Sequence, residues 1–138
     1  MSTIFQSKWS MEKNLEMGFI LNSPFKIISN AANKEIFYKE DNKNKRNKIT
    51  IISTSFSSNI KKGFKYYDFL DKNLDFEKYD YLFAGNCPVN FSNIKLLGCL
   101  KTHQVADVLR KSNIFITASE DDPCSNSLIE ALTCEVPV

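Results

Sequence analysis

The second half of the chain alternates between continuous runs of apolar residues and longer segments in which apolar residues recur every three or four positions. The continuous runs are rich in β-branched and aromatic residues, as is typical of buried strands. They predict strands over 48–54, 79–85, 93–98 and 113–119, with the start of another over 136–138. The segments with helical spacing predict helices over 63–74, 102–112 and 126–134.

Each predicted helix carries one apolar face, and Thr102 is the N-cap expected for the second helix. The residues expected to face inward are Phe64, Tyr67 and Leu70 in the first helix, Val105, Ala106 and Leu109 in the second, and Leu128, Ile129 and Leu132 in the third.

Strands that alternate with helices, and that are apolar throughout, predict an α/β fold with a parallel sheet covered on both faces. Right-handed crossovers between such strands give a doubly wound, Rossmann-like arrangement. Ligands bind such sheets at the carboxyl ends of the strands. The loops in which we expect binding residues are therefore 55–62, 86–92, 98–102 and 119–126.

The first third of the chain has a less regular pattern. It predicts a strand over 3–7, a helix over 10–18 with Ser10 as N-cap, and a strand over 25–30. The segment 41–48, DNKNKRNK, contains no apolar residue and predicts a solvated linker. We therefore expect residues 1–47 to stand apart from 48–138.

Composition narrows the class of protein. With 138 residues, 43% of them hydrophobic and 25% charged, the chain fits one globular domain. A net charge of +2 disfavours nucleic-acid binding. No apolar signal segment and no run of ~18 apolar residues occurs, so we expect a cytoplasmic protein. The four cysteines form no C-x-x-C pair and lack a histidine at metal-ligand spacing, which favours reduced thiols and no metal.

The loop 119–126 and the helix after it carry the first candidate chemistry. Backbone N–H groups of Asn126, Ser127 and Leu128 at a helix start could hold a phosphate. Glu130, one turn on, could accept from ribose hydroxyls, and Asp122 could accept from a sugar. The alternative is a capping box, in which Ser127 and Glu130 only satisfy helix-end donors.

Two other loops contain candidates with open alternatives. Lys62, before Gly63 at a helix start, could reach a diphosphate across the cleft, or it could be a solvated lysine. Gly85 and Asn86 could allow close approach of a ligand or could form only a turn. His103, the only histidine, has no partner in triad order and is expected to be structural.

The C-terminal stretch DPCSNSLIEALTCEVPV resembles the signature of retaining glycosyltransferases with the GT-B fold, family 4 and its relatives. That family carries a Glu-x7-Glu motif followed by EAMACGxPV; Glu130 is the second acid here, and Asp122 takes the first position. SFSSNIKKGF resembles the family's Lys-Gly loop, with Phe56 in an aromatic position. FAGNCPVNFSNIKLLG, TIFQSKWS and IISNAANKEIFY resemble further family stretches in the same order.

The resemblance implies a donor site for a nucleotide-sugar and transfer of the sugar with retention, without a metal cofactor. It implies catalytic roles for Lys62, which would neutralise the leaving nucleotide, and for Asp122 and Glu130, which would contact the sugar and the ribose. The implied donor-binding residues are Gly63, Gly85, Asn86, Ile94, Gly98, Ser125, Asn126, Ser127 and Leu128, with backbone near Ile94 to Gly98 bordering the nucleobase.

The chain also departs from the family pattern. No arginine lies between Thr54 and Ile60, the first acid is shortened to Asp122, and Glu135 takes the place of a glycine. Most of the acceptor-binding domain is missing, so we expect a truncated donor-binding domain over 48–138, incomplete at its C-terminus, after an interdomain remnant and linker over 1–47.

On that basis the glycan or lipid-linked acceptor would bind a missing N-terminal domain, and full-length relatives would associate peripherally with a membrane. We expect the chain alone to be inactive. The alternative is a non-catalytic nucleotide-sugar or partner-binding module from a split or decayed gene. A nucleotide-sugar 2-epimerase is disfavoured, because the cleft would need more histidines and carboxylates.

Overall fold

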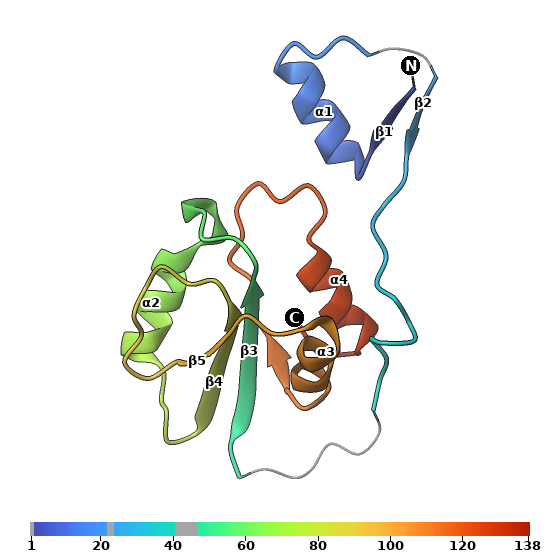
Figure 1. Ribbon diagram of the computed structural model, residues 1–138. Helices are drawn as coiled ribbons and strands as arrows, with labels where there is room; N and C mark the ends of the chain where they lie inside the picture. Colours follow the sequence, from blue (N-terminus) through green and yellow to red (C-terminus); the bar gives the residue numbers. More distant parts are fainter. Residues whose placement is uncertain (1, 22–23, 41–46) are drawn as a thin grey trace.

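The computed structural model describes residues 2–21, 24–40 and 47–138. Its centre is a parallel sheet of four strands in the order β5-β4-β3-β6 (Figure 1). The strands are β3 (Ile49–Ser55), β4 (Tyr79–Gly85), β5 (Lys95–Gly98) and β6 (Ile114–Phe115). The predicted parallel α/β fold is confirmed.

Helices cover both faces of this sheet. Figure 1 shows α2 (Phe64–Asn73) on one side and α3 (Thr102–Arg110) with α4 (Asn126–Thr133) on the other. Successive side chains of a strand point to opposite faces, so Ile51 packs with α2 while Ile52 packs with α3 and α4. Phe83 and Ala84 divide between the two cores in the same way. This is why the strands are apolar at consecutive positions.

The apolar faces predicted for α2 and α3 are confirmed, because Phe64, Tyr67, Val105, Ala106 and Leu109 are all buried. The prediction for α4 is wrong in one position. Leu132 is 52% exposed, whereas Ala131 is fully buried. The eight-residue helix turns its Leu128–Ala131 side toward the core, and Leu132 lies beside that stripe.

The strand predicted over 113–119 pairs with β3 only at Ile114 and Phe115. Ile116 still donates its backbone N–H to the carbonyl of Ile52, at 2.9 Å, before the chain turns away. Residues 136–138 do not form the expected strand, although Phe115 donates a backbone bond to Pro137 at 2.8 Å. The sheet therefore ends at β6 with a single bond to its C-terminal neighbour.

An N-terminal unit stands apart from the sheet (Figure 1). It consists of β1 (Thr3–Phe5), α1 (Lys8–Glu16) and β2 (Phe25–Ile27), with β1 and β2 pairing in parallel. The helix begins two residues earlier than predicted because Ser7, not Ser10, is the N-cap; its hydroxyl accepts the Ser10 N–H at 3.0 Å. Likewise, Lys101 rather than Thr102 is the N-cap of α3.

The segment after β2 returns to the main sheet. Phe37 is 2% exposed and belongs to the core beneath α3 and α4. Arg110 donates to the carbonyl of Ile36 at 2.7 Å, and its guanidinium lies 4.4 Å from the ring centre of Tyr38. Residues 36–38 thus pack on the domain that the sequence assigned to 48–138. Most of the predicted linker 41–48 lies outside the described residues.

Asp71, near the end of α2, holds the loop between β4 and β5. Its buried carboxylate accepts backbone N–H bonds from Ser92, Asn93 and Ile94, at 2.7 to 2.8 Å. Burial alone would raise the pKa of this carboxyl, but the three backbone donors outweigh it and lower the pKa. The contribution of Asp71 to stability is therefore present at neutral pH and lost as the pH falls through this lowered pKa.

Glu135 ends α4 in a conformation that favours glycine. Its φ is 52°, its N–H bonds to Leu132, and the N–H of Val136 bonds to Ala131, both at 3.0 Å. This is the Schellman pattern of helix termination, in which the residue after the C-cap is left-handed. The expectation that Glu135 occupies a glycine position is confirmed.

Replacing Glu135 with glycine should therefore stabilise the protein. Removing the left-handed strain should raise the free energy of unfolding by about 1 kcal/mol, measured by urea denaturation. Glu135→Gln is the matched control, because it removes the exposed ion pair with Lys39 (3.0 Å) and keeps the strain. Equal stability of the glycine and glutamine variants would contradict the prediction.

Candidate functional site

Three loops meet at the carboxyl ends of the strands, called here the carboxyl edge. Backbone contacts bring them together: Asn86 donates to the carbonyl of Ser55 at 2.8 Å, and Glu120 donates to that of Lys61 at 2.7 Å. Two predicted glycines permit this approach. A Cβ at Gly85 would lie 1.8 Å from the carbonyl oxygen of Ser55, and one at Gly63 would lie 2.1 Å from that of Ala118. Any side chain would separate the loops.

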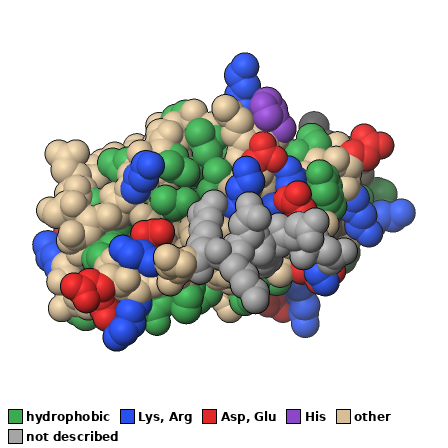
Figure 2. Space-filling view, turned by 90° about the horizontal axis from the view of Figure 1, so that it is seen from below, with side chains coloured by type: hydrophobic (Ala, Val, Ile, Leu, Met, Phe, Trp, Pro, Cys, Tyr) green, Lys and Arg blue, Asp and Glu red, His purple; other side chains and the backbone are tan. Residues whose placement is uncertain are grey.

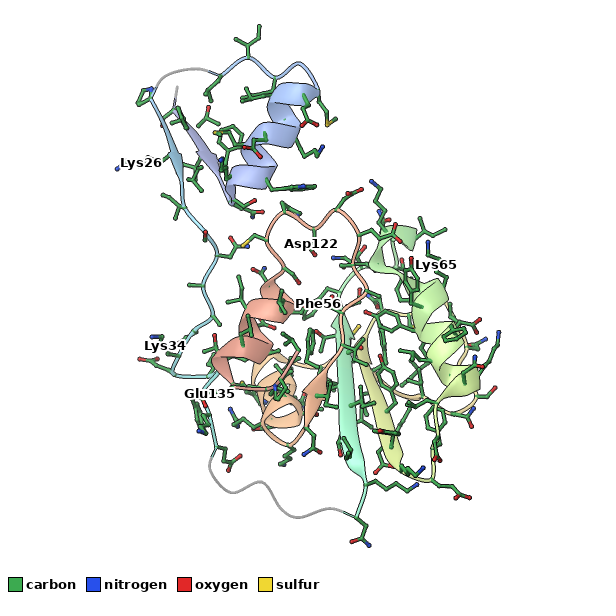
Figure 3. All side chains as sticks on the ribbon, turned by 180° about the vertical axis from the view of Figure 1, so that it is seen from behind. Lys26, Lys34, Phe56, Lys65, Asp122 and Glu135 are labelled. Atoms are coloured by element: carbon green, nitrogen blue, oxygen red, sulfur yellow. The ribbon has the colours of Figure 1, made fainter. Side chains whose placement is uncertain are left out.

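Lys62 and Asp122, the first two predicted catalytic residues, contact each other. The Lys62 Nζ lies 3.0 Å from the Asp122 Oδ2, although the residues are 60 positions apart in sequence. Asp122 also accepts the backbone N–H of Cys124 at 3.3 Å. Figure 3 shows Asp122 on the loop between β6 and α4, on the side of the N-terminal unit.

Within the part of the chain that the structure describes, this pair is one of three lysine–carboxylate pairs between the same two segments. The set, called here the ion-pair ladder, consists of Lys61–Asp121 at 3.0 Å, Lys62–Asp122 at 3.0 Å and Lys65–Glu120 at 3.2 Å. The Lys61–Asp121 and Lys65–Glu120 pairs are well exposed, so each contributes little to stability. Asp121, which lies between Glu120 and Asp122, has a φ of 54°, in the left-handed region of backbone conformation.

The amino end of α4 opens onto this loop. Ser125 is the N-cap: its hydroxyl accepts from the N–H of Leu128 at 3.4 Å, and its carbonyl accepts from Ile129 at 3.1 Å. In residues 2–21, 24–40 and 47–138 no acceptor is found for the backbone N–H groups of Asn126 and Ser127. These two donors, with the positive end of the helix, suit an anionic ligand.

Because Ser125 caps the helix, the capping box between Ser127 and Glu130 is not formed, and that alternative is wrong. Glu130 is partly buried, and burial raises the pKa of its carboxyl. Among the described residues its carboxylate has no hydrogen bond or ion pair. Since the folded state favours the protonated form, stability is lost as the pH rises through this pKa. A partly buried carboxyl group that has no partner among the described residues is suited to contact a ligand.

A cavity of about 530 Å³ lies at the carboxyl edge, between the N-terminal unit and α4. Its walls combine acidic, hydroxyl and apolar side chains. The lining residues are Trp9, Thr117, Ser119, Asp121, Asp122, Cys124, Ser125, Leu128, Ile129 and Leu132. Leu132, which is exposed, forms part of the cavity wall. Three predicted site residues therefore share one cavity.

Sequence reasoning missed two residues near this cavity. Trp9 enters it from α1, and Asn30 donates its side-chain amide to the carbonyl of Cys124 at 3.2 Å and to Asn126 Oδ1 at 2.8 Å. The signal was present, since both residues lie in stretches that resemble family segments, TIFQSKWS and IISNAANKEIFY. Nothing in their local pattern indicated which loop they contact.

Two predicted nucleobase neighbours lie apart from each other. Ile94 is buried and comes directly before the first residue of β5. Its N–H donates a hydrogen bond to the Asp71 carboxylate. The structure therefore does not bring Ile94 to the carboxyl edge. Gly98 ends β5 at that edge with a φ of 69° and open space where a Cβ would stand.

Asn86 is used within the protein. Its amide donates to the carbonyl of Phe56 at 2.7 Å, and its Oδ1 accepts from the thiol of Cys99 at 3.1 Å. These contacts favour the turn alternative for this position. His103 is exposed in the first turn of α3, on the surface seen in Figure 2, where basic and acidic side chains are interspersed.

In the described residues, no group of three or more histidine, cysteine, aspartate or glutamate side chains is placed to hold a metal ion. Over the same residues, no helix is both long and apolar enough to cross a bilayer.

No protein-family model matches the chain, and no curated protein sequence matches it. Among solved structures, the chain is similar to sucrose-phosphate synthase from Thermosynechococcus elongatus, with a TM-score of 0.78 and 16% sequence identity. The match covers 99% of this chain and 39% of that chain. That protein is a GT-B glycosyltransferase, so the α/β fold described above matches part of a GT-B glycosyltransferase.

Gly63→Ala should separate the loops that form the site. The new Cβ would lie 2.1 Å from the Ala118 oxygen, so we expect a loss of at least about 2–3 kcal/mol in the free energy of unfolding. Gly98→Ala is the matched control, since it has a similar φ in open space and should cost only about 1 kcal/mol. Equal losses in urea denaturation would show that the contact between Gly63 and Ala118 is unimportant.

Proposed function

We propose that this chain is the donor-binding part of a retaining glycosyltransferase and that its ligand is a nucleotide-sugar. The observation that carries the proposal is that Asp122 and the N-cap of α4, Ser125, line one cavity of the carboxyl edge, with Lys62 paired to Asp122 at 3.0 Å. A lysine and unpaired helix N–H groups suit a diphosphate, and a carboxylate beside them suits sugar hydroxyls.

The roles divide as follows. The N–H groups of Asn126 and Ser127 hold the diphosphate, and Lys62 neutralises the charge that develops on the leaving nucleotide. Asp122 accepts from hydroxyls of the transferred sugar, and Glu130 accepts from the ribose. These groups supply positive charge to the leaving group without a metal ion.

Sugar transfer also requires an acceptor site, and we assign acceptor binding to a further domain. The glycan or lipid-linked acceptor would approach from the side of the N-terminal unit, where Trp9 enters the cavity. The chain by itself then binds the donor without transferring sugar. Detection of transfer by the purified chain would overturn this part.

A second candidate is a non-catalytic module that binds a nucleotide-sugar or a partner protein. The pairing of Lys62 with Asp122 favours it, because the lysine charge is already neutralised. Adding a separately produced acceptor-binding domain would distinguish the two candidate functions. The donor-binding part of an enzyme should gain transferase activity, and a non-catalytic binding module should not.

Thermal-shift titration with ADP, GDP, UDP and their glucose conjugates tests the donor site. A bound ligand raises the melting temperature by mass action, with about 2.7 kcal/mol of stabilisation at a concentration of 100 Kd. Lys62→Ala and Glu130→Ala should lose the shift. Lys34→Ala, an exposed lysine on the segment after β2 (Figure 3), should keep it. A folded sample that no probe stabilises would overturn the proposal.

Affinity for the sugar conjugate should also depend on pH through Glu130. As the pH falls through the raised pKa of this carboxyl, the carboxylate takes up one proton and becomes a weaker acceptor for ribose hydroxyls, so affinity should fall. The diphosphate diester of the conjugate does not titrate there, so calorimetric titration isolates the protein group. Glu130→Gln should bind weakly with a flat profile. An unchanged pH profile in that variant would exclude Glu130 as the group responsible.

A further inference from the structure

The Lys62–Asp122 pair is less exposed than the other two pairs of the ion-pair ladder. Its side chains are 31% and 18% exposed, whereas those of Lys61 and Asp121 are 63% and 61% exposed. A less solvated pair is screened less by water and salt, so its attraction is stronger. Any anion that binds Lys62 must compete with this carboxylate.

Both oxygens of Asp122 are engaged by groups of the protein itself. Oδ2 accepts from Lys62, and Oδ1 accepts from the N–H of Cys124. A sugar hydroxyl would therefore find the carboxylate more available once Lys62 has moved to a phosphate. The same exchange brings the negative charges of Asp122 and the diphosphate close together, which is unfavourable unless the sugar separates and compensates them.

The backbone on either side of Asp122 is anchored. Glu120 donates to the carbonyl of Lys61 at 2.7 Å, and the carbonyl of Cys124 accepts from Asn30 at 3.2 Å. A rotation of the Asp122 and Lys62 side chains can therefore make the exchange while the loop keeps its place.

We propose that Asp122 is a specificity-determining residue that favours a sugar-bearing diphosphate over a bare nucleoside diphosphate, because it competes with the diphosphate for Lys62 and is compensated only by sugar hydroxyls. The inference rests on the proposed donor site. It adds that Asp122 weakens the binding of ligands that lack the sugar.

Calorimetric titration of Asp122→Asn tests this inference with UDP, GDP, ADP and their glucose conjugates. The variant keeps the Oδ1 acceptor for Cys124 and removes the charge. Bare diphosphates should bind about 10-fold tighter than to the unmodified protein, and the preference for the conjugate should fall toward unity. Asp122→Ser is the second variant if the asparagine protein unfolds. Inorganic pyrophosphate, which tests the anion alone, should also bind tighter.

Glu120→Gln is the matched control. It removes one negative charge from the ladder, at the pair with Lys65, and leaves the Lys62–Asp122 contact in place. Its affinities should change less than about 2-fold, because an exposed charge of this kind is well screened. An equal gain in Glu120→Gln would overturn the inference in favour of a general charge effect.

The remaining outcomes separate the inference from the function on which it rests. If Asp122→Asn binds bare diphosphates no tighter while Lys62→Ala abolishes binding, the competition is refuted and the donor site stands. If no variant binds any probe in a folded sample, both the inference and the proposed donor site are refuted.

Discussion

The position of the candidate groups depends on β3, one of the two inner strands of the sheet, which is hydrogen-bonded on both sides as β4 is. It pairs with β4 along its whole length and with β6 at Ile51 and Ile52. The buried hydroxyl of Ser53 adds a polar link, since it contacts the Tyr81 hydroxyl at 2.8 Å and the Ile116 carbonyl at 2.6 Å. A buried polar group with both partners satisfied fixes the alignment of three segments. Those segments end at the carboxyl edge.

At the carboxyl edge, close contacts between backbone segments and ion pairs between side chains involve the same loops. Gly63 and Gly85 allow the loops to approach within the distance that a side chain would occupy. The lysines and carboxylates of the ion-pair ladder lie across that contact. The close packing at these glycines sets the distance between the lysines and the carboxylates. The attraction between these charges in turn favours the loop conformation that the packing allows. A ligand anion at Lys62 would enter this balance directly.

The N-terminal unit contributes to the site by a different route. Its Trp9 reaches the cavity, while the segment that follows β2 is tied to the amino end of α4 by Asn30 and to α3 by Arg110. The interaction of Arg110 with the Ile36 carbonyl is partly buried, and Phe37 beside it is in the core. These contacts connect the first third of the chain to the helix that would bind the donor.

The sequence by itself determined the α/β class, the parallel order of strands and helices, and the loops that meet at the carboxyl edge. Those properties follow from local periodicity and from the handedness of crossovers, which act over a few residues or between neighbouring elements. The prediction of β4 was correct to the residue, and Glu135 was recognised in a glycine position.

Only the tertiary structure decided which groups touch. The pairing of Lys62 with Asp122, the capping of α4 by Ser125, the burial of Phe37 and the exposure of Leu132 all depend on partners far away in sequence. The loop before β5 is likewise held by a distant residue, because the Ile94 N–H donates to the Asp71 carboxylate. A local pattern shows which side of a helix is apolar. Which distant side chain fills or leaves open the space beside it depends on the packing of the whole domain.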